Sequence, residues 1–405
     1  MRLFSAVAAT SFITLAGLSI VAASHGQHHL VSRVNAAEPQ YLTSSRGNVP
    51  KTEVRPGQLL TVRAASGNGM SAAAKSYSFS YVSTGSSGEK TVTYGRLDLP
   101  RGTAPRRGFP VLGWAPGTSG FAPQCAPSLL GGRSLDATLN EWLARGYAVV
   151  RTDYVGWGQA APRPLLHGRS NADAAINAVT AAHDISHKLA DDWILAGHSE
   201  GGGTAVWAAG TSSATRGHLR LRGAIAYAPT GPGVEKFFRD VLNGEPVAQG
   251  AQPYISVTAL AAWAVNPGID LNKLVADPMK PQLSKARTEC IGALFGLPQL
   301  QPGQYLTKGP DADKLMSYIK AQDPSSLTMR VPVAIFQGGK DESTVKPPTT
   351  KRMIRNLCTR GADIYYKEFP DANHSGVIPA AQSGGTPFDL AADMLKGEAI
   401  PNDCN

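Results

Sequence analysis

The feature of this sequence that most constrains its fold is an apolar run leading directly into a serine flanked by glycines. Residues 193–196, Trp-Ile-Leu-Ala, predict a short buried strand, and residues 197–201 read Gly-His-Ser-Glu-Gly. Residues 202–207 predict the start of a helix. At a sharp strand-to-helix turn, glycines remove side chains that would collide with neighbouring backbone. We therefore expect a nucleophile elbow that exposes the hydroxyl of Ser199, although the five-residue pattern alone also fits an ordinary Gly/Ser loop.

Short apolar runs alternate with helix-like segments along most of the chain. Residues 76–82 and 91–99 have the composition and the intervening turn signals of two antiparallel strands. Amphipathic spacing predicts helices over residues 135–145 and 171–189. This alternation predicts an α/β fold with a mainly parallel central sheet covered by helices on both faces. The further apolar runs that we expect to be strands are 110–115, 147–152, 193–196, 223–228, 331–336 and 364–369.

One interval, residues 233–330, interrupts this alternation. A structureless loop of that length is implausible within a compact domain, so we expect an inserted helical cap or lid that roofs a binding site. The core would then consist of residues 62–232 and 331–405. The helix-like segments within the interval are 234–242, 255–265, 271–275, 283–295 and 312–320.

The N-terminal residues have the layout of a secretory signal peptide. Arg2 precedes an apolar stretch, residues 3–23, which is interrupted by Ser, Thr and Gly and ends in Val-Ala-Ala. The stretch is also long enough to span a bilayer, which leaves a retained membrane anchor as the alternative. We favour cleavage near Ala23 and hence a secreted or periplasmic protein. Residues 24–61 have no hydrophobic period, and we interpret them as a loose leader.

Charge and cysteine content narrow the class of protein. The formal net charge is +9, but Lys and Arg are scattered, whereas a nucleic-acid binder concentrates basic residues in a run or stripe. We therefore expect no nucleic-acid partner. In an exported chain an even number of cysteines predicts disulfides, and four cysteines allow three different pairings. The four are Cys125, Cys290, Cys358 and Cys404.

A serine nucleophile requires a base, and the base requires a carboxylate that orients it. In α/β folds with this elbow, the three groups follow in the chain order serine, acid, histidine. Asp341 follows the apolar run 331–336, and His374 follows the run 364–369. Both positions predict loops at the carboxyl edge of the sheet, where catalytic groups gather. We therefore expect Ser199, Asp341 and His374 to act together.

Other titratable residues provide alternatives to this assignment. Glu342 and Asp371 are rival acids, although Asp371 is more typical of a turn three residues before the histidine. His183 and His187 have the i, i+4 spacing of a zinc-binding helix, but no third ligand is evident, so we expect no metal site. His198 is expected to pack or hydrogen-bond beneath the nucleophile.

Acyl transfer at a serine also needs two N–H groups that stabilise an oxyanion. The amide of Glu200, directly after the nucleophile, is one candidate. The second is expected in the loop after residues 110–115, where Pro116 has no N–H. We assign it to the Thr118 amide, with Gly117 allowing close approach of a substrate. An ordinary Gly/Pro turn is the alternative.

Aromatic residues are candidates for lining a substrate pocket in or under the insertion. For any one of those in the insertion, packing in the cap's own core explains the residue equally well. The candidates are Trp114 and Tyr154 beside the predicted site, and Phe237, Phe238, Tyr254, Trp263, Phe295 and Tyr305 in the insertion.

Four segments together resemble a known family. From residue 61 onward, the chain resembles the secretory lipases of yeasts and bacteria. The resemblance implies an α/β-hydrolase core, a helical cap, a Ser/Asp/His triad, and lipase or esterase activity. The segments are residues 114–120 (Trp-Ala-Pro-Gly-Thr-Ser-Gly), 153–158 (Asp-Tyr-Val-Gly-Trp-Gly), 197–202 (Gly-His-Ser-Glu-Gly-Gly) and 227–229 (Tyr-Ala-Pro).

The resemblance also implies a pairing for the cysteines. Cys125 would pair with Cys290 and tie the neighbourhood of the oxyanion loop to the cap, and Cys358 would pair with Cys404 and fasten the C-terminal tail. The sequence departs from the family at one position. Bacterial members commonly have His where this chain has Pro116, which leaves the shape of that loop and the preferred acyl chain length open.

Together these features predict a serine hydrolase that cleaves a small-molecule or lipid ester through an acyl-enzyme and needs no metal or organic cofactor. Transient contact with a lipid interface is compatible with this reading, and the sequence does not indicate an oligomeric state. Two alternatives are a peptidase or amidase with the same triad and a catalytically silent binding protein of the same fold. Intact candidates for all three catalytic groups argue against the silent protein.

Overall fold

The predicted signal peptide, residues 1–23, and most of the predicted leader lie outside the part of the chain that the structure describes. The last leader residues already belong to β1, Leu59–Ala64, which pairs with β2, Ala73–Thr84. Side chains of β1 are mostly exposed, so this strand has no hydrophobic period to reveal it. The computed structural model describes residues 53–65, 70–130, 134–157, 163–211, 215–342 and 345–404.

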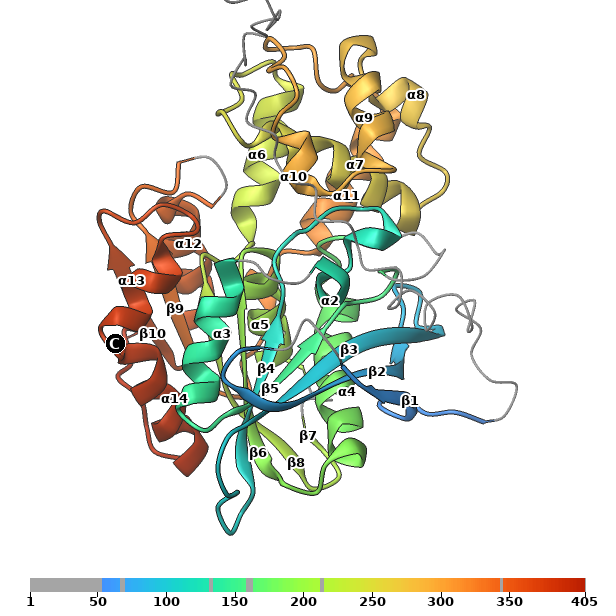
Figure 1. Cartoon of the computed structure of the whole chain (residues 1–405). Helices are drawn as coiled ribbons and strands as arrows, with labels where there is room; N and C mark the ends of the chain where they lie inside the picture. The colour runs from blue at the N-terminus through green and yellow to red at the C-terminus, as the bar shows by residue number, and fades with distance from the viewer. Residues whose placement is uncertain are drawn as a thin grey trace, which may run out of the picture. The chain divides into compact units, whose positions relative to one another are not determined.

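One ten-stranded sheet organises the described chain (Figure 1). The remaining strands are β3 (Lys90–Pro100), β4 (Phe109–Ala115), β5 (Ala148–Thr152), β6 (Leu189–His198), β7 (Thr215–Arg216), β8 (Leu219–Tyr227), β9 (Val333–Gly338) and β10 (Ile364–Phe369). Their order is β1-β2-β3-β5-β4-β6-β8-β9-β10, with β7 paired to the edge of β8. In this order the strands from β5 through β4, β6, β8 and β9 to β10 pair in parallel. The pairs β1–β2, β2–β3 and β3–β5 are antiparallel, as is the pair of β7 with β8. The predicted mainly parallel sheet with its antiparallel pair is thus confirmed.

Helices cover both faces of the sheet, as predicted. Along β4, Val111 packs in the hydrophobic cluster of one face and Leu112 in that of the other. Strands buried on both sides read as nearly continuous apolar runs, which explains why they could be found in the sequence. One face carries α4 (Gly168–Ile185), α5 (Glu200–Ala209) and α12 (Pro347–Cys358), and the other carries α3 (Ser134–Ala144), α13 (Val377–Ser383) and α14 (Thr386–Lys396).

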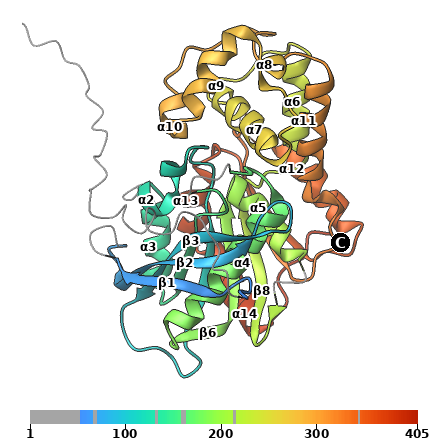
Figure 2. The same cartoon turned by 90° about the vertical axis from the view of Figure 1, so that its right-hand side faces the viewer.

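The chain between β8 and β9 is helical and has a hydrophobic cluster of its own. Figures 1 and 2 show its helices gathered beyond one end of the strands. The predicted helix over residues 283–295 is wrong in one respect: it is two helices, because Cys290 between them is extended and bridges to Gly120. The helices are α6 (Pro232–Leu242), α7 (Gln252–Val265), α8 (Leu271–Leu274), α9 (Lys280–Ala286), α10 (Ile291–Leu294) and α11 (Pro310–Ala321).

Both disulfides implied by the family resemblance are present. Cys125 is bonded to Cys290, and Cys358 to Cys404. The first joins the loop after β4 to the helical insertion, and the second joins the end of α12 to the C-terminal tail. Among the described residues, no helix combines the length and apolar character needed to cross a membrane.

Candidate active site

Ser199 lies at the turn between β6 and α5. Its φ of 59° and ψ of −117° put a residue with a side chain into the left-handed region that favours glycine, which is a strained conformation. Main-chain hydrogen bonds hold it there: its N–H donates to the Tyr227 carbonyl oxygen (2.9 Å). Its carbonyl oxygen accepts from the N–H groups of Gly203 (3.0 Å) and Thr230 (3.1 Å). The predicted strand–turn–helix is present, and the end of β8 fixes the backbone of the serine.

The glycines of the motif are required by close backbone packing. A Cβ atom at Gly197 would lie 2.2 Å from the carbonyl oxygen of Gly201. A Cβ atom at Gly201 would lie 1.9 Å from the carbonyl oxygen of Ala115. No side chain fits at either distance. The bare glycine at position 201 therefore lets the end of β4, and the loop that follows it, reach the first turn of α5.

His374 and Asp341 meet in the loops that follow β10 and β9. Nδ1 of His374 lies 2.5 Å from Oδ2 of Asp341, whose side chain is 0% exposed. Oδ1 of the same carboxylate accepts the N–H of Val345 at 3.0 Å. A carboxylate only accepts, so Nδ1 carries the proton and Nε2 is the basic atom of the ring. That Nε2 is buried and makes no hydrogen bond to any group in the described chain.

The rival acids lie elsewhere. Asp371 is 93% exposed, and its carboxylate pairs with Nζ of Lys340 at 2.8 Å, which lowers its pKa. Glu342 is also exposed. Of the three acids considered from the sequence, the structure brings Asp341 to the imidazole of His374.

His198 joins the elbow to the loop of His374. The rings of the two histidines lie 4.6 Å apart between centroids, and Nε2 of His198 lies 2.8 Å from the carbonyl oxygen of His374. A carbonyl oxygen only accepts, so Nε2 of His198 is the protonated donor. Burial, followed by the nearby His374, lowers the pKa of His198 to about 3, which keeps the ring neutral. His198, expected to pack or hydrogen-bond near the nucleophile, therefore hydrogen-bonds to the loop that carries His374.

The loop after β4 lies beside the nucleophile. A Cβ atom built on Gly117 would be 3.7 Å from Cβ of Ser199, so the two backbones are in close contact. The N–H groups of Thr118 and Glu200 donate to no protein group within the described residues. Free amides at a helix N-terminus and in an adjoining loop form a site suited to an anion. The hydroxyl of Thr118 donates to Oε2 of Glu200 at 2.9 Å.

Two aromatic residues in the connection between β5 and α4 donate hydrogen bonds to carbonyl oxygens of this loop. Tyr154, also in the left-handed region with a φ of 56°, donates its hydroxyl to the carbonyl oxygen of Pro116 at 2.9 Å. Burial, followed by the charge of Glu200, raises the pKa of Tyr154 well above its ordinary value, so the phenol keeps its proton. Trp157 donates Nε1–H to the carbonyl oxygen of Gly120 at 3.0 Å. Tyr154 thus supports the loop rather than lining a pocket.

The aromatic residues expected to line a pocket lie in different environments. Trp114 is buried in the core on the α3 face of the sheet, and Phe238 is buried in the core of the insertion. These two are packing residues. Phe237 and Trp263 are partly buried against the same insertion core, and Phe295 is 48% exposed.

Tyr254 of α7 is a further aromatic candidate from the insertion. Burial and, to a smaller degree, the charge of Asp341 raise the pKa of Tyr254 to about 12. Its ring lies 6.0 Å from that of Phe295 between centroids. The exposed ring of Phe295 therefore packs against the partly buried ring of Tyr254.

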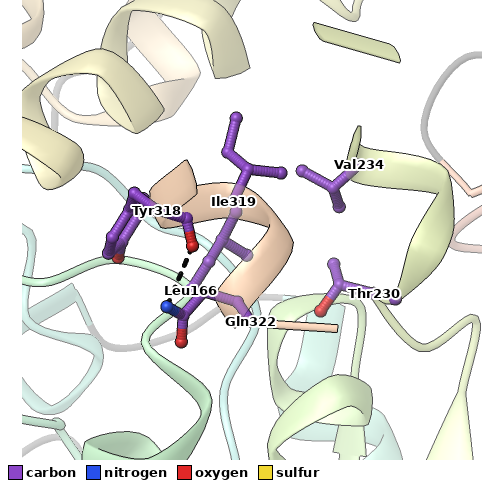
Figure 3. A pocket seen from close by; sticks show the side chains of 7 residues that line it. Leu166, Thr230, Val234, Tyr318, Ile319 and Gln322 are labelled. Atoms are coloured by element: carbon purple, nitrogen blue, oxygen red, sulfur yellow. Dashed lines mark hydrogen bonds between the residues drawn. The ribbon is translucent and has the colours of Figure 1, made fainter. Parts of the chain in front are cut away.

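A pocket between the insertion and the core adjoins the elbow (Figure 3). Thr230 contributes to it, and the N–H of the same residue donates to the carbonyl oxygen of Ser199. Figure 3 shows Ile319 of α11 and Val234 of α6 pointing toward each other across it. No local sequence pattern indicates this pocket, because three distant segments form it. It is lined by Leu166, Thr230, Gly231, Val234, Tyr318, Ile319 and Gln322.

The histidine pair considered as a zinc motif has other partners. Both ring nitrogens of His183 lie against main-chain carbonyl oxygens, those of Val179 (2.8 Å) and Ala190 (3.1 Å). His187 is exposed and lies two residues beyond the end of α4. Within the described ranges, no three His, Cys, Asp or Glu residues gather in a way that could hold a metal ion.

Comparison with protein families gives one match across most of the chain. A family model described as secretory lipase matches residues 135–385. This span includes the elbow, the insertion, and the loops that carry Asp341 and His374. No curated protein sequence matches the chain.

Solved structures share the fold at low sequence identity. The rice cell wall degrading esterase LipA from Xanthomonas oryzae, in a ligand-bound form, is 20% identical with a TM-score of 0.66, and the match covers 84% of this chain and 98% of LipA. Lipase A from Candida antarctica is 18% identical with a TM-score of 0.68, over 87% of this chain and 84% of the lipase. These likenesses show that the fold is that of the α/β-hydrolases.

Proposed function

This chain belongs to the secretory lipase family and is a carboxylic-ester hydrolase, and we propose that it cleaves its substrate through an acyl-enzyme on Ser199. In this proposal His374 is the general base and Asp341 orients it. The substrate is a small-molecule or lipid ester.

The state of His374 carries the proposal. One ring nitrogen is bonded to a buried carboxylate, and the other is buried without a hydrogen bond. A buried polar atom normally has a partner, so this unpartnered basic nitrogen supports a role as proton acceptor. The ring that carries it packs against His198, the chain neighbour of the strained Ser199. Hydrogen bonds between catalytic groups, such as that between a serine hydroxyl and its histidine base, are often long before a substrate binds.

In the first step, Nε2 of His374 takes the proton of the Ser199 hydroxyl while Oγ attacks the ester carbonyl carbon. The carbonyl π electrons move to oxygen, and the amides of Thr118 and Glu200 stabilise the resulting oxyanion. The intermediate collapses, the bond to the alcohol oxygen breaks, and His374 returns the proton to the leaving alcohol. Asp341 stabilises the imidazolium while it exists.

In the second step, water takes the place of the alcohol. His374 removes one proton from water, the hydroxide oxygen attacks the acyl carbon, and the same two amides stabilise the second oxyanion. The bond to Oγ of Ser199 then breaks, and the proton on His374 returns to Oγ. The products are a carboxylic acid and an alcohol, and the enzyme is regenerated.

The helical insertion, residues 233–330, is proposed to act as a cap that selects the substrate. Its Tyr254 packs against Phe295, whose side chain is 48% exposed, and this supports an apolar surface on the cap. We propose that this surface makes brief contact with a lipid interface. A rate that rises sharply when an ester exceeds its solubility would support this contact, and a smooth saturation curve would not.

Export is proposed from residues 1–23 as a cleaved signal peptide. Two disulfides in the described chain fit an oxidising compartment. Mass spectrometry of the protein recovered outside the cytoplasm is expected to find a chain that starts near Ser24. A chain that retains its first residues in the membrane fraction would support an uncleaved anchor instead.

The function is tested with a chain-length series of p-nitrophenyl esters and a parallel set of aminoacyl amides. Wild type and the control Ser383→Ala, an exposed serine on α13, are expected to hydrolyse the esters. Ser199→Ala is expected to lose ester turnover by about a millionfold. Activity that survives this substitution contradicts the proposed nucleophile, and turnover of amides alone contradicts the esterase.

A further inference from the structure

The carboxylate of Glu200 lies where an uncompensated negative charge would oppose the proposed reaction. Glu200 directly follows the nucleophile, and its amide is a proposed oxyanion donor. The side chain of Glu200 is nevertheless 1% exposed. A negative charge so close repels the charge that develops on the substrate oxygen, and water-poor surroundings strengthen that repulsion. This carboxylate must therefore be neutralised for the oxyanion hole to work.

Arg163 supplies the compensating charge. Its Nη2 lies 2.5 Å from Oε1 of Glu200, and its side chain is 0% exposed. The guanidinium lies over the ring of Trp157, with Cζ 3.6 Å from the ring centroid, a stacking that suits a planar cation. The N–H of Leu166 (2.9 Å) and Nδ2 of Asn171 (3.0 Å) also donate to Oε1. Oε1 of Glu200 therefore accepts hydrogen bonds from three donors, none of which belongs to the oxyanion loop.

The second oxygen of the same carboxylate binds the oxyanion loop. Oε2 of Glu200 accepts the hydroxyl of Thr118 at 2.9 Å, and the amide of Thr118 is the other proposed oxyanion donor. Arg163 fixes Glu200, and Glu200 fixes Thr118. The position of one buried arginine therefore affects both proposed oxyanion donors, the amides of Thr118 and Glu200.

The segment that carries Arg163 holds the loop at two further points. Tyr154 binds the carbonyl oxygen of Pro116, and Trp157 binds that of Gly120. Trp157 is also the ring on which the guanidinium of Arg163 lies. The arginine is thus part of the same buried support as the two aromatic anchors.

We propose that Arg163 is a positioning residue for ester hydrolysis, which cancels the charge of Glu200 and thereby fixes Thr118 in the oxyanion hole. The inference rests on the proposed function, because it concerns the same hole. An interaction that matters when the oxyanion forms changes kcat, whereas one that only binds substrate changes KM. A merely structural ion pair would change the amount of folded enzyme and leave kcat per active site unaltered.

The first test is a double-mutant cycle of Arg163→Met and Glu200→Gln. Active sites are titrated with a fluorophosphonate, so that kcat refers to competent enzyme. Arg163→Met is expected to lower kcat per site by about a hundredfold with KM within about twofold, because the carboxylate is left buried and unpaired. Adding Glu200→Gln removes that charge and is expected to recover about tenfold of the loss. An unchanged kcat per site in Arg163→Met, or no recovery in the double variant, overturns the proposal.

Variants of Thr118 test the positioning role if Arg163→Met does not fold. Thr118→Val keeps the amide and the side-chain shape but removes the hydroxyl that binds Glu200, and Thr118 is only partly buried. We expect kcat to fall by about tenfold at constant KM, and Thr118→Ser to recover most of that loss. Equal kcat in wild type and Thr118→Val contradicts the positioning role.

The matched control is Arg151→Met. Arg151 pairs with the buried Asp98 at 2.7 Å, in a contact between β5 and β3 that does not reach the oxyanion loop. It is expected to lower the melting temperature without changing kcat per titrated site. Ser199→Ala distinguishes failure of the proposed function from failure of the role proposed for Arg163. If Ser199→Ala stays active, the proposed function is wrong. If it is inactive and the Arg163 variants keep wild-type kcat, only the role of Arg163 is wrong.

Discussion

His198 is a partly buried histidine that donates a hydrogen bond to the loop of His374 as a neutral ring. Burial lowers its pKa to about 3, against an ordinary value of 6.5, and the neutral ring donates to the loop of His374. Between these two values the unfolded chain binds a proton at His198 that the folded chain does not. The free energy of unfolding therefore falls as the pH is lowered through that window.

We expect His198→Gln, which keeps an N–H donor but cannot titrate, to lose less stability in acid than wild type. The measurement is the melting temperature of both proteins from pH 7 to pH 4. Asp153, whose pKa is raised by burial to about 6, acts in the opposite direction, but it is present in both proteins and cancels in the comparison. Parallel curves for the two proteins would contradict a buried neutral His198.

Asp341 and Asp371 provide a matched pair of aspartates. In Asp341→Asn the amide cannot act as the anionic partner of His374, and kcat is expected to fall by about 10⁴-fold with the fold retained. Asp371→Asn changes an exposed group paired with Lys340 and is expected to keep wild-type kcat. Steady-state kinetics with a p-nitrophenyl ester provide the comparison. A large loss in the Asp371 variant and none in the Asp341 variant would reverse the assignment.

For individual residues, the sequence predicts side chains that directly follow a strand. It does not predict side chains that come together only through tertiary packing. Asp341 and His374 could be named because each comes directly after a buried apolar run. Arg163 carries no such signal, since its partner Glu200 is distant in sequence and its segment has no periodicity. From the sequence alone, Tyr154 is expected to line a pocket, because nothing in the sequence shows that its hydroxyl bonds to the carbonyl oxygen of Pro116.

The same distinction holds for strands and helices. The six predicted parallel strands are present because burial on both faces leaves a continuous apolar run, as in β9. Strand β1 escaped prediction because most of its side chains are exposed, and its register depends on main-chain pairing with β2. The predicted helix over 283–295 ends early because Cys290 is held in an extended conformation by its partners across the loop.

The two disulfides are expected to differ in their effect on catalysis. Cys290 bridges Gly120, and the N–H of Ile291 donates to the carbonyl oxygen of Ser119 at 2.8 Å, so the Cys125–Cys290 bond adjoins the oxyanion loop. Chain entropy assigns it at most about 5 kcal/mol for a separation of 165 residues, and about 4 kcal/mol to the 46-residue separation of the other bond.

Replacing either cysteine pair with alanine is therefore expected to lower the free energy of unfolding in urea. Only the variant without Cys125 and Cys290 is expected to lower kcat per titrated site as well, because the loop loses an anchor. The variant without Cys358 and Cys404 serves as its control. Equal kcat in the two variants would show that the first bond does not hold the oxyanion loop.

For the whole molecule, the sequence predicts a sheet covered by helices on both faces, but it does not predict the order of the strands in that sheet. Alternating runs indicate a parallel sheet between helices, yet nothing in them says that β4 lies between β5 and β6. The insertion could be predicted from its length and its lack of strands. The pocket beside the elbow could not, because Leu166, Thr230 and Ile319 meet only when the insertion packs on the core.

The role proposed for Ser199, the nucleophile of an ester hydrolase, can be tested on the protein itself. Its most direct test is reaction of the folded, disulfide-bonded protein with a fluorophosphonate, followed by peptide mapping and an activity assay on the same samples. We expect one phosphonyl group per chain, on Ser199, with ester turnover lost in proportion to labelling and no labelling after denaturation. Label on another residue, or full turnover in protein labelled at Ser199, would contradict it.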